Sequence, residues 1–227
     1  MEQALIEDLV KEVRITLDEN RLEYSYLEEN NTDNMDLNEI IRAKLLDSIR
    51  IILEACPVSL LSPISMSISE EGKITGDDGS GTVTLPEDFL RLVSFKLNTW
   101  NRAVVNAAEE GSSIDLMQRN AFTRGTPIKP VCVFSHNEKG ERTMEYFTAG
   151  KDSGGKYDHA IQRALYVKIP SVTENDDGQE SVIIPKLLRF AIINYCAGLT
   201  ETSRGNTEFG QVFFNIATSS LTRTNNS

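Results

Sequence analysis

The spacing of apolar residues changes twice along this chain, and that change limits the folds open to it. Near both ends, apolar residues recur every three or four positions, which is typical of helices with one buried face. Between them, apolar and polar residues alternate and glycines and prolines interrupt the segments, which is typical of short strands and turns. We therefore predict an α+β fold, mainly a helical bundle built from both ends, with a small β-rich region inserted in the middle.

These patterns divide the chain into three parts. Residues 1–57 are predicted to form two helices, residues 58–184 the β-rich middle region, and residues 185–227 a helical hairpin followed by a tail. The apolar faces of the first two and the last two helices are wide, so we expect the C-terminal part to pack with residues 1–57 as one bundle. The β segments would then form a smaller sheet or barrel.

The N-terminal helices are predicted from their apolar stripes and their ends. A first helix should cover residues 1–17. A second should begin at Asp36, where Glu39 completes a pattern like a capping box, and it should run to about Ala55, before Pro57. The stripe of the first helix consists of Leu5, Leu9, Val10, Val13 and Leu17.

The two C-terminal helices differ in character. Residues 187–199 are apolar on nearly every side, which predicts a helix that is buried over most of its surface. After a break at Gly205, a last helix should have one apolar stripe, with Phe214 lying off that stripe and facing a partner. The stripe consists of Phe209, Val212, Phe213, Ile216 and Ala217.

Strands and turns are predicted for most of the middle region. One strand should end at Leu85 and Pro86, and a half-buried strand should follow over residues 90–97, where apolar and polar residues alternate. The other predicted elements are helices over 100–110 and 113–120, a hairpin over 131–148, a strand over 165–169 and a polar loop over 173–180.

Charge and cysteine usage limit the partners and the compartment. The chain has 34 acidic and 23 basic residues, and a net charge of −11 disfavours tight, sequence-tolerant binding to a phosphate backbone. Solubility alone explains such a charge, and so does a surface that lets DNA pass without sticking. Cys56, Cys132 and Cys196 lie in separate apolar runs, as buried free thiols do. With no secretory signal and no apolar run long enough for a bilayer, we expect a protein made in a reducing cytoplasm, without a membrane.

One segment comes close to a nucleotide-binding motif. Residues 150–156 satisfy the spacing GxxxxGK, but Tyr157 stands where a Ser or Thr hydroxyl would bind magnesium. The preceding segment has the pattern of half a hairpin, whereas a phosphate-binding loop joins a buried parallel strand to a helix. We interpret residues 150–156 as a flexible Gly-rich loop.

No set of residues predicts chemistry. His136 and His159 have no cysteine or carboxylate at ligand spacing, so each is interpreted as a surface residue. Cys132 lies in the apolar run VCVF and is predicted to be a packed strand residue and not a nucleophile. We therefore predict no catalytic, cofactor-binding or metal-binding residue, which favours a structural role.

Three segments resemble the head–tail connector (adaptor or ring) proteins of tailed bacteriophages. Residues 82–97, TVTLPEDFLRLVSFKL, have the strand, LPxDF turn and second strand often found in that family. Residues 120–134, NAFTRGTPIKPVCVF, lead into a strand through two prolines. Residues 185–221 form a helix pair with the small-residue segment Cys196-Ala197-Gly198. The pattern is most similar to ring proteins of the podovirus-like phages that include the crAss-like group.

The resemblance implies a structural virion protein with no enzymatic activity and no cofactor. It implies a ring of twelve copies at the head–tail junction, assembled in the bacterial host cytoplasm and docked below the portal protein. The ring would contact the next tail or ring protein and let DNA pass through its channel without specific binding. Ring closure requires a head-to-tail interface between neighbours.

The same resemblance places the interface at the C-terminal end. The last helix is expected to contact neighbouring copies, and the tail over residues 222–227 is expected to reach the portal. The residues of this predicted subunit or portal interface are Phe209, Phe213, Phe214, Leu221, Thr222 and Arg223.

Two other functions stay open on the sequence. A tail-tube or tail-hub component would have a strand-dominated fold that stacks, and the four predicted long helices weigh against it. A nucleotide-binding enzyme would use the loop over residues 150–156.

Overall fold

The chain folds into two units, each with its own core. A computed structural model places Met1–Ser62 and Ile169–Ser227 in one unit, which we call the helical unit, and Pro63–Lys168 in the other, which we call the β unit. The α+β class is confirmed: helices lie at both ends of the chain, and ten short strands, among the residues described, form three small antiparallel sheets. The residues described are 1–19, 37–69, 71–175 and 177–224.

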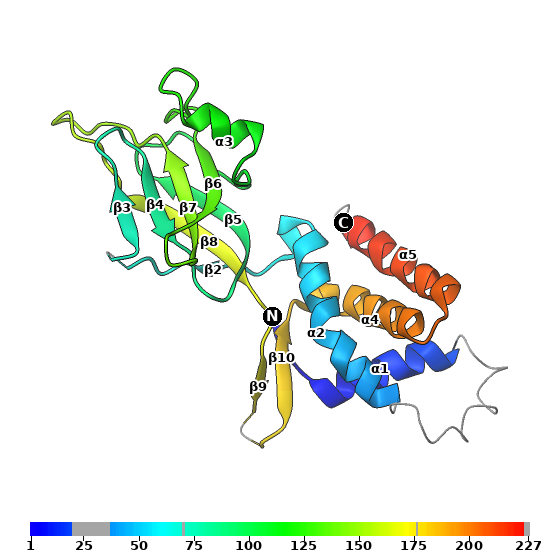
Figure 1. Cartoon of the computed structure of the whole chain (residues 1–227). Helices are drawn as coiled ribbons and strands as arrows, with labels where there is room; N and C mark the ends of the chain where they lie inside the picture. The colour runs from blue at the N-terminus through cyan, green and yellow to red at the C-terminus, as the bar shows by residue number, and fades with distance from the viewer. Residues whose placement is uncertain (20–36, 70, 176, 225–227) are drawn as a thin grey trace. The chain divides into compact units, whose positions relative to one another are not determined.

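The helical unit combines helices from both ends of the chain with a three-stranded antiparallel sheet of order β1-β10-β9 (Figure 1). Its helices are α1 (Ile6–Glu19), α2 (Leu37–Ala55), α4 (Arg189–Ser203) and α5 (Thr207–Thr224), with 3-10 turns at Val58–Leu60 and Lys186–Leu188. Its strands are β1 (Glu2–Leu5), β9 (Val172–Glu174) and β10 (Glu180–Ile184).

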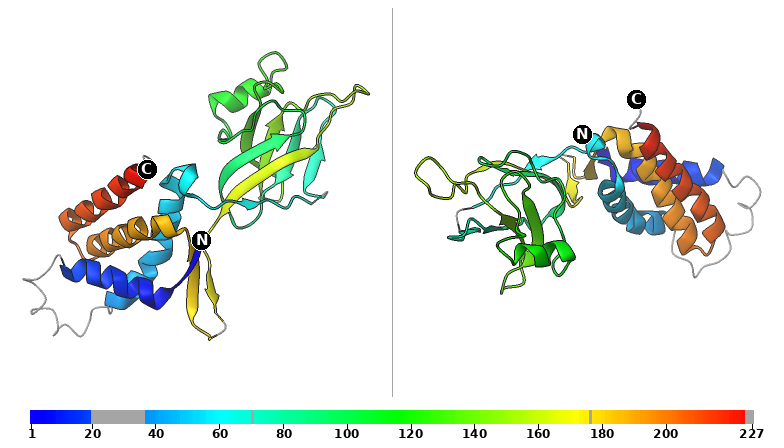
Figure 2. Two further views of the ribbon diagram at one scale, coloured as in Figure 1. Left: turned by 180° about the vertical axis from the view of Figure 1, so that it is seen from behind. Right: turned by 90° about the horizontal axis from the view of Figure 1, so that it is seen from above.

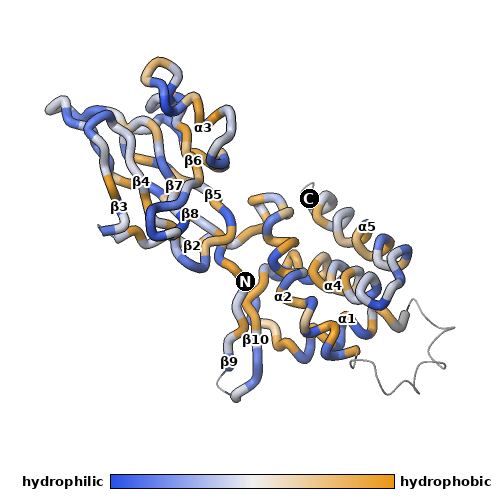
Figure 3. The backbone as a smooth tube through the Cα atoms, viewed as in Figure 1, coloured by the Kyte–Doolittle hydropathy of each residue, from blue (hydrophilic) through white to orange (hydrophobic). Residues whose placement is uncertain are grey.

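The central helix of this unit is α4, which contacts α1, α2 and α5. Its sequence is apolar on nearly every side, and most of its residues are buried, as predicted. Figure 3 shows the hydrophobic residues gathered along it. The other three helices each bury one stripe: Leu9, Val13 and Leu17 in α1, Ile41, Leu45 and Ile49 in α2, and Phe213, Ala217 and Leu221 in α5.

Two glycines let α4 and α5 approach closely, and Figure 2 shows these helices side by side. A Cβ atom at Gly198 would lie 2.5 Å from the Phe214 ring and 3.0 Å from the Gly210 carbonyl oxygen. A Cβ atom at Gly210 would lie 2.9 Å from the Gly198 carbonyl oxygen. The backbones therefore touch at a point where only glycine fits.

The predicted first helix begins later than expected, because residues 2–5 form β1. Strand β1 pairs with β10, so that buried Ala4 lies opposite buried Val182. Arg189, at the start of α4, holds this arrangement through ion pairs with Glu2 (2.8 Å) and Glu12 (2.6 Å), which belong to β1 and α1. One guanidinium group thus ties two neighbouring N-terminal elements to the distant helix α4.

The β unit contains two antiparallel sheets with a shared core (Figure 1). One sheet has the order β2-β8-β5, and the other has the order β3-β4-β7-β6. Their bounds are β2 (Ile64–Ser65), β3 (Lys73–Thr75), β4 (Gly81–Thr84), β5 (Phe89–Leu97), β6 (Val131–His136), β7 (Arg142–Phe147) and β8 (Ile161–Lys168), and a short helix, α3 (Ser113–Gln118), lies between β5 and β6.

Aromatic side chains from both sheets form the centre of the β unit. The ring of Phe95 lies 5.7 Å from that of Trp100 and 5.8 Å from that of Tyr146, and all three residues are almost fully buried. The indole of Trp100 donates a hydrogen bond of 2.9 Å to the Thr148 carbonyl oxygen. Rings with a polar atom are stable in a core when that atom finds a partner.

The predicted helix over residues 100–110 is wrong. Trp100, Val104 and Ala107 have helical spacing, but they are buried in the β-unit core as parts of an irregular segment. Val104 forms a two-way backbone bridge with Phe95, and Ala108 forms one with β6. The backbone N–H and C=O groups of this segment bond to neighbouring strands and not within a helix. Apolar spacing over such a short window therefore predicted the wrong element.

The β-unit bounds differ from the predicted middle region of residues 58–184. Residues 169–184 belong to the helical unit, because β10 pairs with β1 on the N-terminal segment. The predicted polar loop over 173–180 is therefore shorter, and its ends form the hairpin of β9 and β10. Strand β5 is also buried on both faces along Leu92–Phe95, whereas the alternation had predicted a half-buried strand.

We expect Gly198→Ala to destabilise the protein, although alanine normally improves a helix by about 1 kcal/mol over glycine. The added methyl group meets the Phe214 ring and the α5 backbone, and such overpacking should lower the free energy of unfolding by about 1–3 kcal/mol. Urea unfolding measures this change. Adding Phe214→Ala to the Gly198→Ala protein should recover part of the lost stability. A Gly198→Ala protein as stable as the wild type would contradict the close contact.

Candidate functional site

The predicted interface residues of α5 divide between its buried and exposed faces. Phe213 and Leu221 are buried in the helical unit, so their side chains serve its core in this structure. Phe214 does not point away from the unit as expected, because its ring lies 4.8 Å from that of Tyr195 and covers Gly198. Phe209 is 51% exposed, and Thr222 is exposed.

The C-terminal end of the predicted interface lies at the limit of the described residues. The backbone of Arg223 belongs to α5, whereas its side chain lies outside the described residues, as do residues 225–227 of the predicted portal-binding tail. The assignment of Phe209, Thr222 and Arg223 to an interface stays a prediction.

Helix α5 exposes part of the apolar stripe that the sequence pattern had treated as one. Phe209, Val212 and Ile216 recur at helical spacing and are 51%, 53% and 38% exposed. We call these three residues the α5 face. The stripe that is buried consists of Phe213, Ala217 and Leu221, one position further round the helix, so a wide apolar surface had left the true buried side ambiguous.

The negative charge of the protein is concentrated in one unit. The helical unit has 20 acidic and 10 basic residues, whereas the β unit has 14 acidic and 13 basic residues. The helical unit therefore carries a net charge of −10 and the β unit one of −1. A polyanion is repelled by the first and is nearly unaffected by the net charge of the second.

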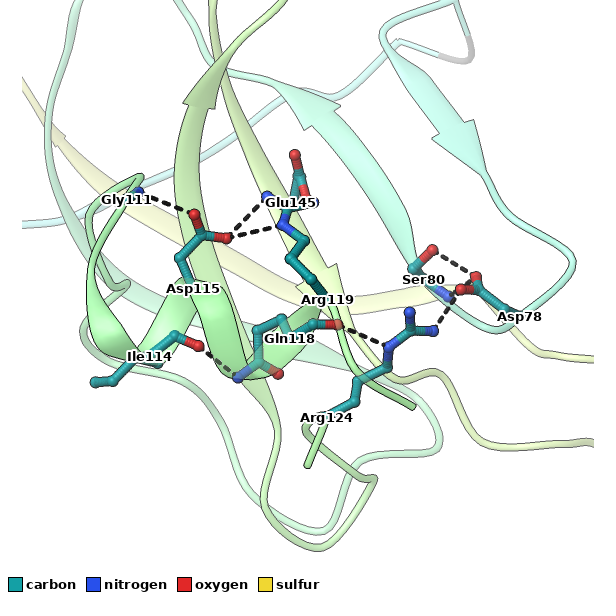
Figure 4. Close-up of polar contacts among 9 residues, drawn as sticks. All are labelled: Asp78, Ser80, Gly111, Ile114, Asp115, Gln118, Arg119, Arg124 and Glu145. Atoms are coloured by element: carbon teal, nitrogen blue, oxygen red, sulfur yellow. Dashed lines mark hydrogen bonds and ion pairs between the residues drawn. The ribbon is translucent and has the colours of Figure 1, made fainter. Parts of the chain in front are cut away.

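In the β unit, α3 and the segment after it are held by a network of polar side chains (Figure 4). The carboxylate of Asp115, 5% exposed, accepts hydrogen bonds from the Gly111 amide (2.9 Å) and from Arg119 (2.8 and 3.1 Å). Arg119 also forms an ion pair of 2.8 Å with Glu145 on β7. These acidic partners raise the pKa of Arg119, with Glu145 contributing most.

A second set of bonds closes the loop that follows α3. The buried side chain of Gln118 accepts a hydrogen bond from the Gly125 amide (2.7 Å) and donates one to the Ile114 carbonyl oxygen (2.8 Å). Arg124 donates to the Gln118 carbonyl oxygen (3.0 Å) and forms an ion pair with Asp78 (Figure 4). Hydrogen bonds from Ser80, followed by that from Arg124, hold the pKa of Asp78 well below its usual range.

This braced segment displays apolar side chains to solvent. Phe122 is 98% exposed, and Leu116 and Met117 are more than half exposed. An exposed aromatic ring on an otherwise ordered loop is unusual for a surface that only meets water. The segment was noted in the sequence for its prolines, whereas the exposure of Phe122 depends on a turn that no local pattern indicates.

We expect Gln118→Ala to loosen this loop and lower the free energy of unfolding by about 1–3 kcal/mol, because the buried Gly125 amide loses its acceptor. Hydrogen exchange should become faster at Gly125 and its neighbours. Gln211→Ala, at an exposed position on α5, is the matched control and should change the stability by less than about 0.5 kcal/mol. Equal protection of Gly125 in Gln118→Ala and wild type would contradict the role of Gln118.

The LPEDF segment is a corner between the two sheets of the β unit. Strand β4 ends before Leu85 in one sheet, and β5 begins at Phe89 in the other. Phe89 is buried, stacks on the Tyr166 ring at 5.7 Å and lies under the Arg142 guanidinium. Asp88 accepts a hydrogen bond of 2.8 Å from the Tyr166 hydroxyl. The motif thus has a structural explanation within the chain, since each of its key side chains has a partner there.

Tyr166 makes this corner sensitive to alkaline pH. Burial, followed by its hydrogen bond to Asp88, raises the pKa of Tyr166 to about 12. An unfolded tyrosine has a pKa of about 10, so the folded protein keeps a proton that the unfolded chain loses. The stability that this group contributes is present below about pH 10 and is lost as the pH rises towards 12.

We therefore expect Tyr166→Phe to lose less stability than wild type between about pH 9 and pH 11, because one raised pKa has been removed. Part of the loss should remain, since burial also raises the pKa of Tyr146. Urea unfolding at several pH values measures how the free energy of unfolding changes with pH in the variant and in wild type. A slope as steep in the variant as in wild type would show that Tyr166 does not titrate as described.

The loop over residues 150–156 lacks the geometry of a phosphate-binding loop. It connects β7 with β8, which belong to two different antiparallel sheets, and Lys151 bridges to Tyr157 as in a tight hairpin turn. The Asp152 carboxylate accepts hydrogen bonds from the amides of Gly154 (2.8 Å) and Lys156 (3.0 Å). In a nucleotide site such amides would hold phosphate oxygens. The context that the nucleotide-binding alternative requires is therefore missing from this segment.

The histidines and cysteines show how the remaining reactive groups are held. His136 is exposed beside Glu110. His159 is only partly exposed: it shares a hydrogen bond of 2.9 Å with the Tyr146 hydroxyl, and burial lowers its pKa. All three cysteines are buried and free. Burial raises the pKa of Cys132 and Cys196, so both stay protonated thiols near neutral pH.

Within the described part of the chain, no group of three or more metal-ligating side chains gathers. Nor does any helix there have both the length and the apolar character to cross a bilayer. A scan against models of known protein families matches none of them, and a search of curated proteins finds none significantly similar to this chain.

Proposed function

We propose that this protein is a structural component of a tailed-phage virion. It forms a closed ring below the portal, joins the head to the tail and extends the DNA channel. In this role the protein acts by shape and charge and carries out no reaction. The proposal starts from the resemblance of residues 82–97, 120–134 and 185–221 to head–tail connector proteins.

The observation that carries the proposal is the α5 face. A ring subunit must bury a surface against a neighbour, and that surface is recognised as apolar area that the isolated chain leaves in water. Phe209, Val212 and Ile216 form such a face on a helix whose neighbouring stripe, Phe213, Ala217 and Leu221, is packed in a core. Because the interface is head-to-tail, this face meets a different surface of the next copy.

The charge distribution supports the passage of DNA. With a net charge of −10, the helical unit presents the surface that we assign to the channel. Like charges keep a duplex from adhering to the wall, so DNA moves through without being held. The ring consists of twelve copies of the chain. Its partners are the portal above and the next tail component below, with the C-terminal tail from Thr222 directed to the portal.

We expect Val212→Asp to prevent ring formation without unfolding the protein. Val212 is 53% exposed, so the change should alter stability by less than about 0.5 kcal/mol, whereas an aspartate buried in an interface is strongly unfavourable. Negative-stain electron microscopy of the protein mixed with the portal encoded in the same genome should show rings for wild type and none for the variant.

Gln211→Asp is the matched control, since it adds the same charge one position away on an exposed part of α5. It should form rings as wild type does. Wild-type protein that forms no ring with the portal would overturn the proposed function. Rings of Val212→Asp would remove the α5 face from the interface.

A further inference from the structure

The β unit has a hollow of about 580 Å³ beside its β2-β8-β5 sheet. Its lining comes from β2 and the residues after it, from Lys73 on β3, and from the first half of β8. The charged residues that line it are Lys73 and Arg163. A carboxylate does not appear among these lining residues, although the chain as a whole is acidic.

These cations have no partner among the residues described, since no ion pair joins either Lys73 or Arg163 to a described carboxylate. Arg163 also lies directly opposite Lys96 in the pairing of β5 with β8. Like charges in directly opposed positions destabilise a sheet. A negative group bound from outside would offset this repulsion.

The hollow lies where β2 ends. The last bond from the β2 side runs from the Met66 amide to the Ala164 carbonyl oxygen. Beyond this point β2 no longer covers β8, and the pairing of β8 with β5 is irregular at Gln162. An acidic segment bound there would bring its carboxylates to the two cations.

The helical unit contains an edge strand with the matching charge. The hairpin of β9 and β10 has carboxylates at Glu174, Asp177 and Glu180 and no basic residue over 172–184. Glu180 pairs with Arg42, whereas Glu174 and Asp177 have no ion pair with any residue described. Strand β9 is the outermost strand of its sheet, and all of its residues are exposed.

We infer that the β9–β10 hairpin of one copy docks in the basic hollow of the next copy. Glu174 and Asp177 lie against Lys73 and Arg163 in the hollow at the end of β2. The inference rests on the proposed function, in that it supplies a head-to-tail contact through which copies join into a ring. The two surfaces are different and complementary in charge, as such a contact requires.

The first test is zero-length carbodiimide coupling of an equimolar mixture of unlabelled and ¹⁵N-labelled full-length protein, followed by mass spectrometry. We expect Lys73 linked to Glu174 or Asp177 in isotopically mixed pairs. Lys73→Arg should abolish the link but keep association, because it retains the charge and removes the amine. Links of Lys73 only within one isotope, or no link to these carboxylates, would overturn the inference.

The second test exchanges the charges. Lys73→Glu with Arg163→Glu, and Glu174→Lys with Asp177→Lys, should each weaken association by about tenfold or more in sedimentation velocity, and mixing the two variants should restore it. Lys139→Glu with Lys156→Glu, at exposed turns, is the control of equal charge and should associate as wild type. Failure of the mixture to recover would overturn the contact.

The two proposals fail differently. Rings on the portal together with unaffected association of the charge variants would remove the hairpin contact and keep the proposed function. Mixed-isotope links at Lys73 without any ring would keep the contact, in an open assembly, and would remove the proposed function.

Discussion

Burial of α4 on almost every side is the constraint on which the helical unit depends. Its neighbours α1 and α2 come from the start of the chain and α5 from the end, so the unit cannot form until both ends meet. The contact between Gly198 and Gly210 sets how closely α5 can lie, and Arg189 fixes the entry of α4 against Glu2 and Glu12. Because α5 is held in this orientation, its remaining apolar residues lie at the surface. The exposed α5 face is thus a consequence of how the core is filled.

The β unit is stabilised differently, by aromatic rings shared between two sheets and by polar side chains that brace its loops. The LPEDF corner moves the chain from one sheet to the other, and the partners of Asp88 and Phe89 show why this sequence occurs at that point. The net charge of the β unit is near zero, whereas that of the helical unit is strongly negative. Two units of such different charge fit the proposed function, in which one surface faces DNA and others contact protein.

Much of the fold could be predicted from the sequence, because long apolar stripes and strict alternation report burial directly. Helices α2, α4 and α5, strand β5 and the β6–β7 hairpin follow from those patterns. Residues 100–110 were mistaken for a helix, since three buried residues at helical spacing satisfy both a helix and an irregular segment. Strand β1 was missed, because its pairing with β10 joins residues about 180 positions apart. The interface residues were harder still: Phe209 and Phe213 have the same chemistry, and only the packing of α5 decides that one is exposed and the other is buried.

The central claim is that copies of this chain close into a ring of fixed size. The most direct measurement is the mass of the complex with the portal by native mass spectrometry. The account predicts one dominant species, whose added mass is a single whole multiple of the 25.3 kDa chain. A ladder of masses that rises one chain at a time, or a portal that gains no mass, would contradict it.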